Sequence, residues 1–433
     1  MKSNFQTIIL AVFLAFFVFA VLIFSGVLPI GNSATTNNAP AGKVVVWGTF
    51  PAADVSKAFD AMNSSTLTVS YMQIPASEYQ SDLIKAFASG TTPDLFFLTP
   101  DMILQNSNFI YHIPYATYPQ KTFQDTFVDG ANVYLGTDGT IAMPIVVDPL
   151  VLYYNKNLLA NESIAVPPKQ WSELFNLNSQ LTKKDTNGNV TQSMIALGTY
   201  GNTNNAKDII SALLLQSGVP ITSRTSSGAM VSALNTSSSS GTIYADSVLS
   251  FYTGFADPTK TAYSWNRGLG NSLDAFTGNK LAFYVGHASE LFNIESINPN
   301  LSFNVQKILQ TQGTPDSTYG TFYALAINKK STNVTSALGV AKLLSDGAGA
   351  TAISADVSLP PTSRALLAVA PADPYLTTFF DSAIISHAWL DPDAGGTDTI
   401  FSQMVENILS SKLQVSDAVS QAGAQIGLLL NKN

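Results

Sequence analysis

The sequence contains no cysteine, and this absence excludes several classes of chemistry. The chain forms no disulfide, holds no metal through thiolates and has no cysteine nucleophile. It also lacks the lipid-modified cysteine that ties many surface proteins to a membrane. Three histidines are present, His112, His287 and His387, and none has a partner at the spacing of a zinc site. We therefore expect no metal and no cofactor.

Charge is also scarce, and its balance is acidic. Only 12% of the residues are charged, and the formal net charge is -8. No run of lysine or arginine is available to neutralise phosphates or to adhere to anionic lipid, so nucleic acid is not an expected partner. The sequence has neither a G-x-S-x-G nucleophile elbow nor a phosphate-binding glycine loop. We expect no enzymatic activity.

What the chain does have is length and apolar residues. Hydrophobic residues make up 46% of the 433 positions, enough for large buried cores. A chain of this length exceeds one ordinary core, so two lobes are expected.

The N-terminus carries the longest apolar run. Residues 8–28 are almost unbroken apolar sequence, and as a helix they would span about 31 Å. That length crosses a bilayer core of about 30 Å and exceeds the usual core of a signal peptide, about 7–15 residues. With Lys2 as the positive flank, we predict an N-terminal transmembrane anchor at 1–30 and an exported body, in preference to a signal peptide cleaved near Ala34 or Ala41. Residues 31–42 are polar and predict a flexible linker with a reach of about 20 Å.

The first part of the body alternates strand and helix patterns. Short apolar runs at 43–47, 67–72 and 95–98 predict strands, and helical spacing at 54–62 and 79–87 predicts the connecting helices. This order predicts an α/β fold with a parallel sheet. The Ser/Thr/Gly-rich residues 222–241 predict a mobile excursion, and residues 185–189 (Asp-Thr-Asn-Gly-Asn) predict a tight turn at a hairpin tip rather than a calcium loop.

Residues 142–159 are the most informative stretch. They read as a strand that leaves one domain, crosses at Asp148-Pro149 and enters a second domain as Leu-Val-Leu-Tyr-Tyr-Asn. Four segments in order along the chain resemble the family 1 extracellular solute-binding proteins, the relatives of maltose-binding protein that serve carbohydrate ABC importers. These segments are 152–156, 166–174 (Val-Pro-Pro-Lys-Gln-Trp-Ser-Glu-Leu), 274–286 (Asp-Ala-Phe-Thr-Gly-Asn-Lys-Leu-Ala-Phe-Tyr-Val-Gly) and 359–364 (Leu-Pro-Pro-Thr-Ser-Arg), and residues 320–328 also lie where the family returns a strand to the first lobe.

The resemblance implies a two-lobed, periplasmic-binding-protein-like (type II) fold with a multi-strand hinge. It assigns 43–147 plus 304–328 to lobe 1 and 148–303 plus 329–433 to lobe 2, with crossings near Val147-Asp148, near Phe303 and near Lys329. It also implies a monomer that captures a carbohydrate by hinge closure and delivers it to the permease subunits of an ABC importer. The body is expected on the extracytoplasmic side of the cell membrane, held there by a single pass of the N-terminal helix.

Candidate ligand contacts follow from the fold and from sugar chemistry. Open α/β sheets place ligands beyond the carboxyl ends of their strands, and sugars require hydrogen-bonding groups beside aromatic rings. The tryptophans each have a packing alternative: Trp171 is expected in the core, Trp47 either contacts ligand or plugs a strand end, and Trp265 either stacks on sugar or packs. The candidates are Trp47, Thr49, Thr99, Asp101, Asp148, Trp265, His287, Tyr319 and Trp389.

Three other functions remain open from the sequence. The solute is a sugar in the preferred reading, but a non-sugar solute fits a similar cleft, and a sensory receptor lobe has the same architecture. A secreted glycoside-acting enzyme would need two carboxylates across a cleft, and Asp101, Asp148 and Glu290 are the available acids.

Overall fold

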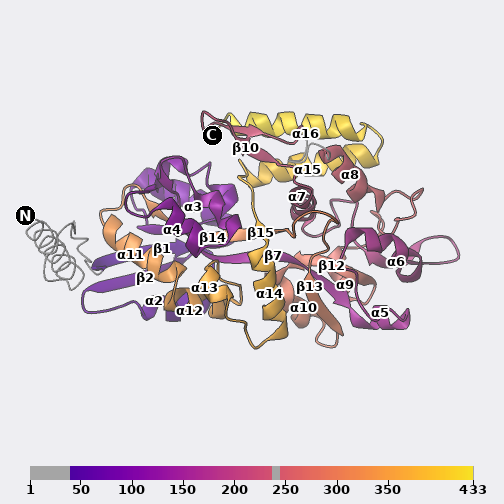
Figure 1. Ribbon diagram of the computed structural model, residues 1–433, viewed down its shortest axis with the longest axis horizontal. Coiled ribbons are helices and arrows are strands. Elements are labelled where there is room, and N and C mark those ends of the chain that lie inside the picture. Colours follow the sequence, from indigo (N-terminus) through magenta and orange to yellow (C-terminus); the bar gives the residue numbers. More distant parts are fainter. Residues whose placement is uncertain (1–39, 237–243, 433) are drawn as a thin grey trace, which may run out of the picture. The chain divides into compact units, whose positions relative to one another are not determined.

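The computed structural model describes residues 40–236 and 244–432, and Figure 1 shows their helices and strands. The transmembrane anchor expected at 1–30 lies outside these residues, as does nearly all of the expected linker at 31–42. Within the described ranges, no helix combines the length and the apolar character needed to cross a membrane. The described residues from Gly42 onward belong to one compact unit, which is described below.

Short helices and strands alternate along this unit. The strands are β1 (Gly42–Gly48), β2 (Leu67–Gln73), β3 (Leu95–Leu98), β4 (Ile110–Tyr111), β5 (Ile113–Pro114), β6 (Gly139–Thr140), β7 (Met143–Asn155), β8 (Lys183–Lys184), β9 (Val190–Ile195), β10 (Thr222–Arg224), β11 (Met230–Ser232), β12 (Leu281–His287), β13 (Phe303–Lys307), β14 (Thr318–Asn328) and β15 (Ser386–His387). The α-helices are α2 (Ala52–Asp60), α3 (Ala76–Ser89), α4 (Gln120–Thr126), α5 (Lys156–Asn161), α6 (Leu174–Leu181), α7 (Ala206–Gln216), α8 (Ala245–Gly254), α9 (Ser272–Thr277), α10 (Leu291–Ile297), α11 (Val334–Ser345), α12 (Ala348–Val357), α13 (Arg364–Leu367), α14 (Pro374–Ile384), α15 (Ala394–Leu409) and α16 (Val415–Leu430). The 3₁₀ helices are η1 (Pro100–Met102), η2 (Ser107–Phe109), η3 (Asp129–Tyr134), η4 (Trp171–Glu173) and η5 (Ala288–Glu290).

The first five elements form the strand–helix order that the sequence predicted. β1 pairs in parallel with β2 and with β3, and α2 and α3 make the connections. All four residues of β3 are buried, as expected of a parallel strand covered on both faces. α3 ends at Gly90, whose φ of 81° is the left-handed conformation that favours glycine at a helix end. The predicted parallel sheet is confirmed for this region.

β7 and β14 join two halves of one large sheet, whose order is β2-β1-β3-β14-β7-β12-β9-β8. Residues 143–149 of β7 pair antiparallel with β14, whereas residues 150–155 pair with β12 and β13. We call the strands up to this change of partner (β1–β4, β14 and residues 143–149) the first half of the sheet. The second half comprises residues 150–155 with β8, β9, β12 and β13. The change falls at Asp148-Pro149, where the sequence predicted a crossing.

The other passages between the halves differ in position from those expected. β13 begins at Phe303 opposite Asn155, so the chain is still in the second half there. It returns where β14 begins, at Thr318–Gly320, and the end of β14 next to Lys329 lies well inside the first half, with Ile327 opposite Leu95. A third passage runs through β15, which pairs in parallel with the start of β14. This strand is two residues long, too short to leave a periodic signal in the sequence.

Helices cover both halves of the sheet, and their packing refines the expected division. α12 packs against α2, and α11 packs against β1 and β14, so residues 334–357 lie on the first half. α15 and α16 pack against each other and against α7 and α8 on the second half, as Figure 1 shows. The expected lobe 2 segment 329–433 is therefore split between the two halves. The predicted helical stripes at 400–409 and 415–426 are confirmed as core, since Phe401 and Ile426 are fully buried.

Two polar segments of the sequence form hairpins. The turn at residues 185–189 joins the antiparallel strands β8 and β9, as predicted. Asp185 accepts hydrogen bonds from the backbone N–H of Asn187 and Asn189, so its carboxylate holds the turn together. The excursion expected at 222–241 contains instead a second hairpin, because Thr222–Arg224 pairs with Met230–Ser232. Residues 237–243 lie outside the described ranges.

Candidate functional site

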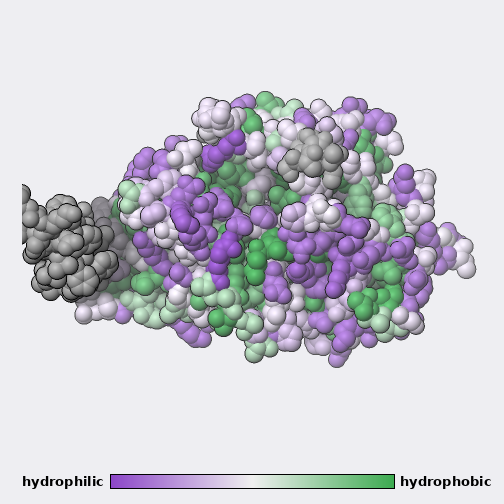
Figure 2. Space-filling model, in the orientation of Figure 1, coloured by the Kyte–Doolittle hydropathy of each residue, from purple (hydrophilic) through white to green (hydrophobic). Residues whose placement is uncertain are grey.

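A cavity of about 400 Å³ lies where the two halves of the sheet meet. One wall comes from the segments after β1 and β3, the facing wall from the start of α7, and the floor from β14. In Figure 2, hydrophobic residues gather near the middle of the view, at the position of β7 in Figure 1. Largely hydrophilic surfaces lie on both sides of them. The lining residues are Thr49, Ala76, Tyr79, Gln80, Phe97, Thr99, Asp101, Met102, Lys207, Asp208, Tyr319, Thr321, Tyr323 and Asp391.

The first wall presents a carboxylate beside hydroxyl groups. Thr49 and Thr99 follow the carboxyl ends of β1 and β3, which lie side by side because the strands are parallel. Thr99 Oγ1 donates a short hydrogen bond to Asp101 Oδ1. Burial raises the pKa of the Asp101 carboxyl, while the Thr99 hydrogen bond opposes this change. Asp101 is thus a desolvated acceptor at the edge of the cavity.

The facing wall contains an ion pair. Lys207 Nζ lies 2.5 Å from Asp391 Oδ2, and both side chains are largely buried. The same ammonium donates to Thr397 Oγ1 at 2.8 Å and to the backbone oxygen of Ala394 at 3.2 Å. All three donors of the lysine are therefore engaged within the protein.

The floor is built by alternate residues of β14. Tyr319, Thr321 and Tyr323 are two residues apart, so their side chains share one face of the strand. That face carries two phenol rings and a hydroxyl into the cavity. The strand provides apolar ring surface and hydrogen-bonding groups together.

Behind the facing wall, His287 links Asp208 to the crossing strand. Its Nε2 lies 3.0 Å from Asp208 Oδ2, and its Nδ1 lies 3.1 Å from the backbone oxygen of Asp148. A backbone oxygen and an ionised carboxylate can only accept, so this geometry suits a ring that is protonated at both nitrogens. Burial lowers the pKa of His287, but the Asp148 carboxylate and the Asp208 hydrogen bond outweigh it and raise the pKa to about 10. Asp148 in turn accepts from the backbone N–H of Ser289 at 3.0 Å.

The structure brings together four of the nine predicted ligand contacts. Thr49, Thr99, Asp101 and Tyr319 line the cavity. Asp148 and His287 are buried behind the cavity. His287 contacts Asp208, and Asp208 lines the cavity.

The three candidate tryptophans are not among the residues that line this cavity. Trp265 is 1% exposed, and its Nε1 donates to Asn202 Oδ1 at 3.3 Å. Trp389 is also buried, stacks on Phe401 and lies beneath the ammonium of Lys207. Trp47 sits in β1, and its backbone oxygen accepts from Tyr79. For Trp47 and Trp265, packing was the predicted alternative to ligand contact, and their positions agree with packing.

Several lining residues were missed from the sequence. Lys207 and Asp208 lie in the first turn of a largely apolar helix, where an acidic residue is also an ordinary feature of helix starts. Thr321 and Tyr323 stand in strand alternation with Tyr319, and this pattern was a usable signal. Asp391 lies two residues after Trp389, but nothing in that spacing places it opposite Asp101.

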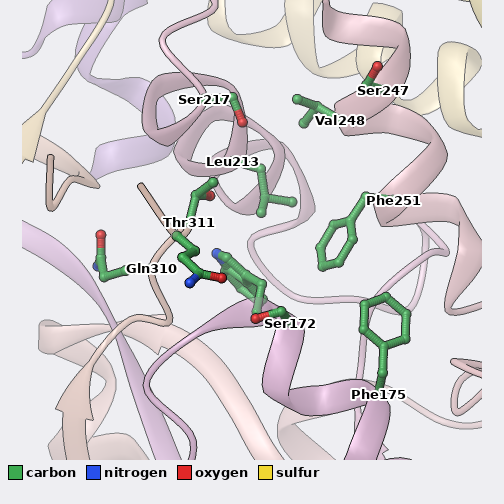
Figure 3. Close-up of a pocket in the computed structure, with 11 residues that line it drawn as sticks. Ser172, Phe175, Leu213, Ser217, Ser247, Val248, Phe251, Gln310 and Thr311 are labelled. Carbon is green, nitrogen blue, oxygen red and sulfur yellow. The ribbon is translucent and has the colours of Figure 1, made fainter. Parts of the chain in front are cut away.

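A second cavity, of about 420 Å³, lies wholly within the second half (Figure 3). Phe175 and Phe251 point into it, and Leu213 and Val248 lie around them. Trp171 on its wall is 4% exposed and donates to Gln216 Oε1 at 2.7 Å, which confirms the predicted core role. Its walls are mainly apolar, so it offers a polar solute fewer partners than the first cavity does.

The first cavity is lined by groups that can hold a polar solute. Its polar groups are hydroxyls, carboxylates, the carboxamide of Gln80 and one neutralised ammonium. Of the acids considered for glycoside chemistry, Asp148 is held by Ser289, and Glu290 accepts from Asn205 and from Tyr284. In the described part of the chain, no cluster of three or more His, Cys, Asp or Glu is arranged to hold a metal ion.

Comparison with known proteins gives one family. The profile described as bacterial extracellular solute-binding protein matches residues 54–377. A protein of Brucella abortus (strain 2308) named as a binding protein is 27% identical over 122 residues, which are 28% of this chain and only 29% of that relative.

Solved structures of similar fold extend over most of the chain. The cyclic α-maltosyl-1,6-maltose binding protein from Arthrobacter globiformis has a TM-score of 0.73 and 18% identity, over 91% of this chain and 100% of that one. A cyclo/maltodextrin-binding protein complexed with maltotetraose has a TM-score of 0.70 and 14% identity, over 90% and 97% of the two chains. At these identities the likeness shows the fold.

Proposed function

The chain belongs to the bacterial extracellular solute-binding proteins, and from this premise we propose that it captures a carbohydrate between the two halves of its sheet and delivers it to an ABC importer. Membership places the body outside the cytoplasm. The proteins of this family bind solutes, and we propose no reaction.

The cavity at the junction of the two halves carries this proposal. It combines phenol rings from β14 with carboxylates and hydroxyls from both facing walls. A sugar has an apolar ring face and a rim of hydroxyls, so this combination matches its chemistry. The similar structures named for maltose-type and maltodextrin ligands support the same class of solute.

We propose that the two halves act as lobes that close on the solute. The expected division, 43–147 plus 304–328 against 148–303 plus 329–433, is kept with two changes: residues 304–317 join lobe 2, because β13 pairs with the second half, and α11 and α12 join lobe 1, because they pack on its strands. The passages at Asp148-Pro149, at the start of β14 and at β15 form the hinge. A solute that contacts both walls favours the closed form, since only that form offers all its contacts.

Of the predicted site residues, Thr49, Thr99, Asp101 and Tyr319 are proposed to contact the solute directly. Asp148 and His287 are proposed to hold Asp208 in place behind the cavity. Trp47, Trp265 and Trp389 are proposed to act through packing, since the first cavity is lined by other residues.

Attachment and partners complete the proposal. The apolar residues 8–28 support a single-pass anchor, with residues 31–42 as the tether that keeps the body near the membrane. The partners are the permease subunits of the importer, and the protein acts as a monomer.

The test measures binding and turnover in one sample. The full chain, in detergent, is titrated calorimetrically with a panel of neutral mono- and oligosaccharides, amino acids and polyols, and the recovered ligand is then analysed by mass spectrometry. We expect saturable binding of a saccharide that is recovered intact. Binding only of a non-sugar solute would contradict the carbohydrate assignment, and recovery of a cleaved saccharide would favour a glycoside-acting enzyme.

A further inference from the structure

The charged groups in and behind the cavity bear on the charge of the solute. Four carboxylates, Asp101, Asp148, Asp208 and Asp391, gather in or directly behind it, and two cations, Lys207 and His287, lie among them. Lys207 pairs with Asp391, and His287 lies between Asp148 and Asp208. The cluster therefore keeps an excess of negative charge after its own ion pairs are formed.

The excess is centred on Asp101. Among the described residues, Thr99 is the side chain that donates to this carboxylate, through Oδ1. Lys207, the cation across the cavity, has all its donors engaged by Asp391, Thr397 and Ala394. Asp101 thus accepts no hydrogen bond from Lys207, and the charge of that lysine acts on it only at a distance.

A second carboxylate oxygen is available on the opposite wall. Asp208 accepts from His287 through Oδ2, and its Oδ1 has no hydrogen-bond donor within the described ranges. Both Asp101 and Asp208 line the cavity. A ligand placed between them meets acceptors from both sides.

The rings around these acids suit a cation as well. Tyr79, Phe97, Tyr319 and Tyr323 all line the cavity. The negative face of an aromatic ring attracts an ammonium group, and the same ring packs against the apolar face of a sugar. An anionic sugar would meet repulsion from the acids, whereas a neutral sugar would offer them hydroxyl donors but no positive charge.

We infer that the solute is a carbohydrate bearing a protonated amino group, which Asp101 binds from one wall and Asp208 from the other. The inference rests on the proposed function, since it names the class of sugar bound at the same site. A hydrogen bond between an ammonium and a carboxylate is roughly twice as strong as one between neutral groups, so the amine is preferred over the matching hydroxyl.

Calorimetry on the full chain in detergent tests the inference with matched probes. Glucosamine and its disaccharide, each with an N-acetylated and a hydroxyl counterpart, are titrated at about pH 6, where an aliphatic amine of this kind is protonated. We expect the amine form to bind about tenfold or more tightly than both neutral forms. Raising the salt from about 0.05 M to about 0.5 M should weaken the binding of the amine more than that of the neutral forms.

The variant Asp101→Asn tests the assigned contact. It should reduce the preference for the amine to about threefold or less, whereas Asp60→Asn, an exposed carboxylate on α2, should leave the preference unchanged. The salt comparison on the unaltered protein decides the matter if Asp101→Asn does not fold.

The possible failures are distinct. If the neutral sugars bind as tightly as the amines, the inference is overturned while the proposed function stands. If no saccharide of any charge binds, the proposed function falls and the inference falls with it.

Discussion

The charge of a single side chain, His287, is set by its surroundings. Its ring is buried between Asp148 and Asp208, and these acids raise the pKa to about 10 from the ordinary 6.5. Because the folded state holds this proton more tightly than the unfolded state does, the contribution to stability is complete below about pH 6.5. It declines as the pH rises and is lost above about pH 10.

The variant His287→Gln should reveal this dependence. Its deficit in the free energy of unfolding, relative to the unaltered protein, should shrink between pH 6.5 and about 10, by at most about 1.4 kcal/mol per pH unit. Urea denaturation at several pH values measures it. A deficit for His287→Gln that stays constant over the range would show that the ring is not held charged.

Trp265 and Tyr319 should separate packing from binding. Trp265→Phe loses the indole hydrogen bond to Asn202 and should lower the free energy of unfolding by at least about 1 kcal/mol, with the dissociation constant unchanged. Tyr319→Ala removes a ring from the cavity floor and should weaken binding by roughly 1–3 kcal/mol. Calorimetry and urea denaturation on both variants measure the two quantities. Weaker binding by Trp265→Phe would return this residue to the site.

Among the secondary-structure elements, β7, β14 and β15 are packed closely where they pass between the halves. Gly320 lies at this point, and a Cβ placed on it would come within 2.8 Å of Val147 Cγ2 and 2.9 Å of Ser386 Oγ. All three passages thus meet around one glycine, and the approach leaves no room for a side chain.

Gly320→Ala should therefore destabilise the fold by about 1–3 kcal/mol through overpacking. Gly427→Ala is a matched control on α16, where a Cβ meets nothing within 4 Å, and it should stabilise by about 0.4–1 kcal/mol. Chemical denaturation of both variants gives the comparison. An unchanged stability for Gly320→Ala would mean that the three passages separate easily.

The elements also show which local signals are readable in a sequence. β1 to β3 and their helices were predicted well because apolar runs and helical spacing recur there without interruption. The hairpin of β10 and β11 was missed because its three-residue strands are rich in Ser and Thr and carry no apolar alternation. The passage at β15 was missed because this strand has two residues, too few to show an alternation of apolar and polar side chains.

At the scale of the whole molecule, the family was identified from the order of several weak segments, and β7 changes its pairing partners at Asp148-Pro149, the position predicted for a crossing between lobes. The cavity was predicted in part: Thr49, Thr99 and Asp101 follow from the rule that ligands gather at strand ends. Lys207, Asp208 and Asp391 could not be predicted as part of the cavity, because they come together through packing between segments nearly 200 residues apart. A tryptophan alone does not identify a sugar contact, since an indole that suits a sugar also suits a core.

We propose that two lobes close over a solute by bending at the passages around Asp148 and Gly320. Small-angle X-ray scattering on residues 42–433, with and without the saccharide found by calorimetry, tests it most directly. We predict a smaller radius of gyration in the saturated sample than in the ligand-free one. Scattering curves that superimpose although calorimetry proves the sample saturated would contradict the claim.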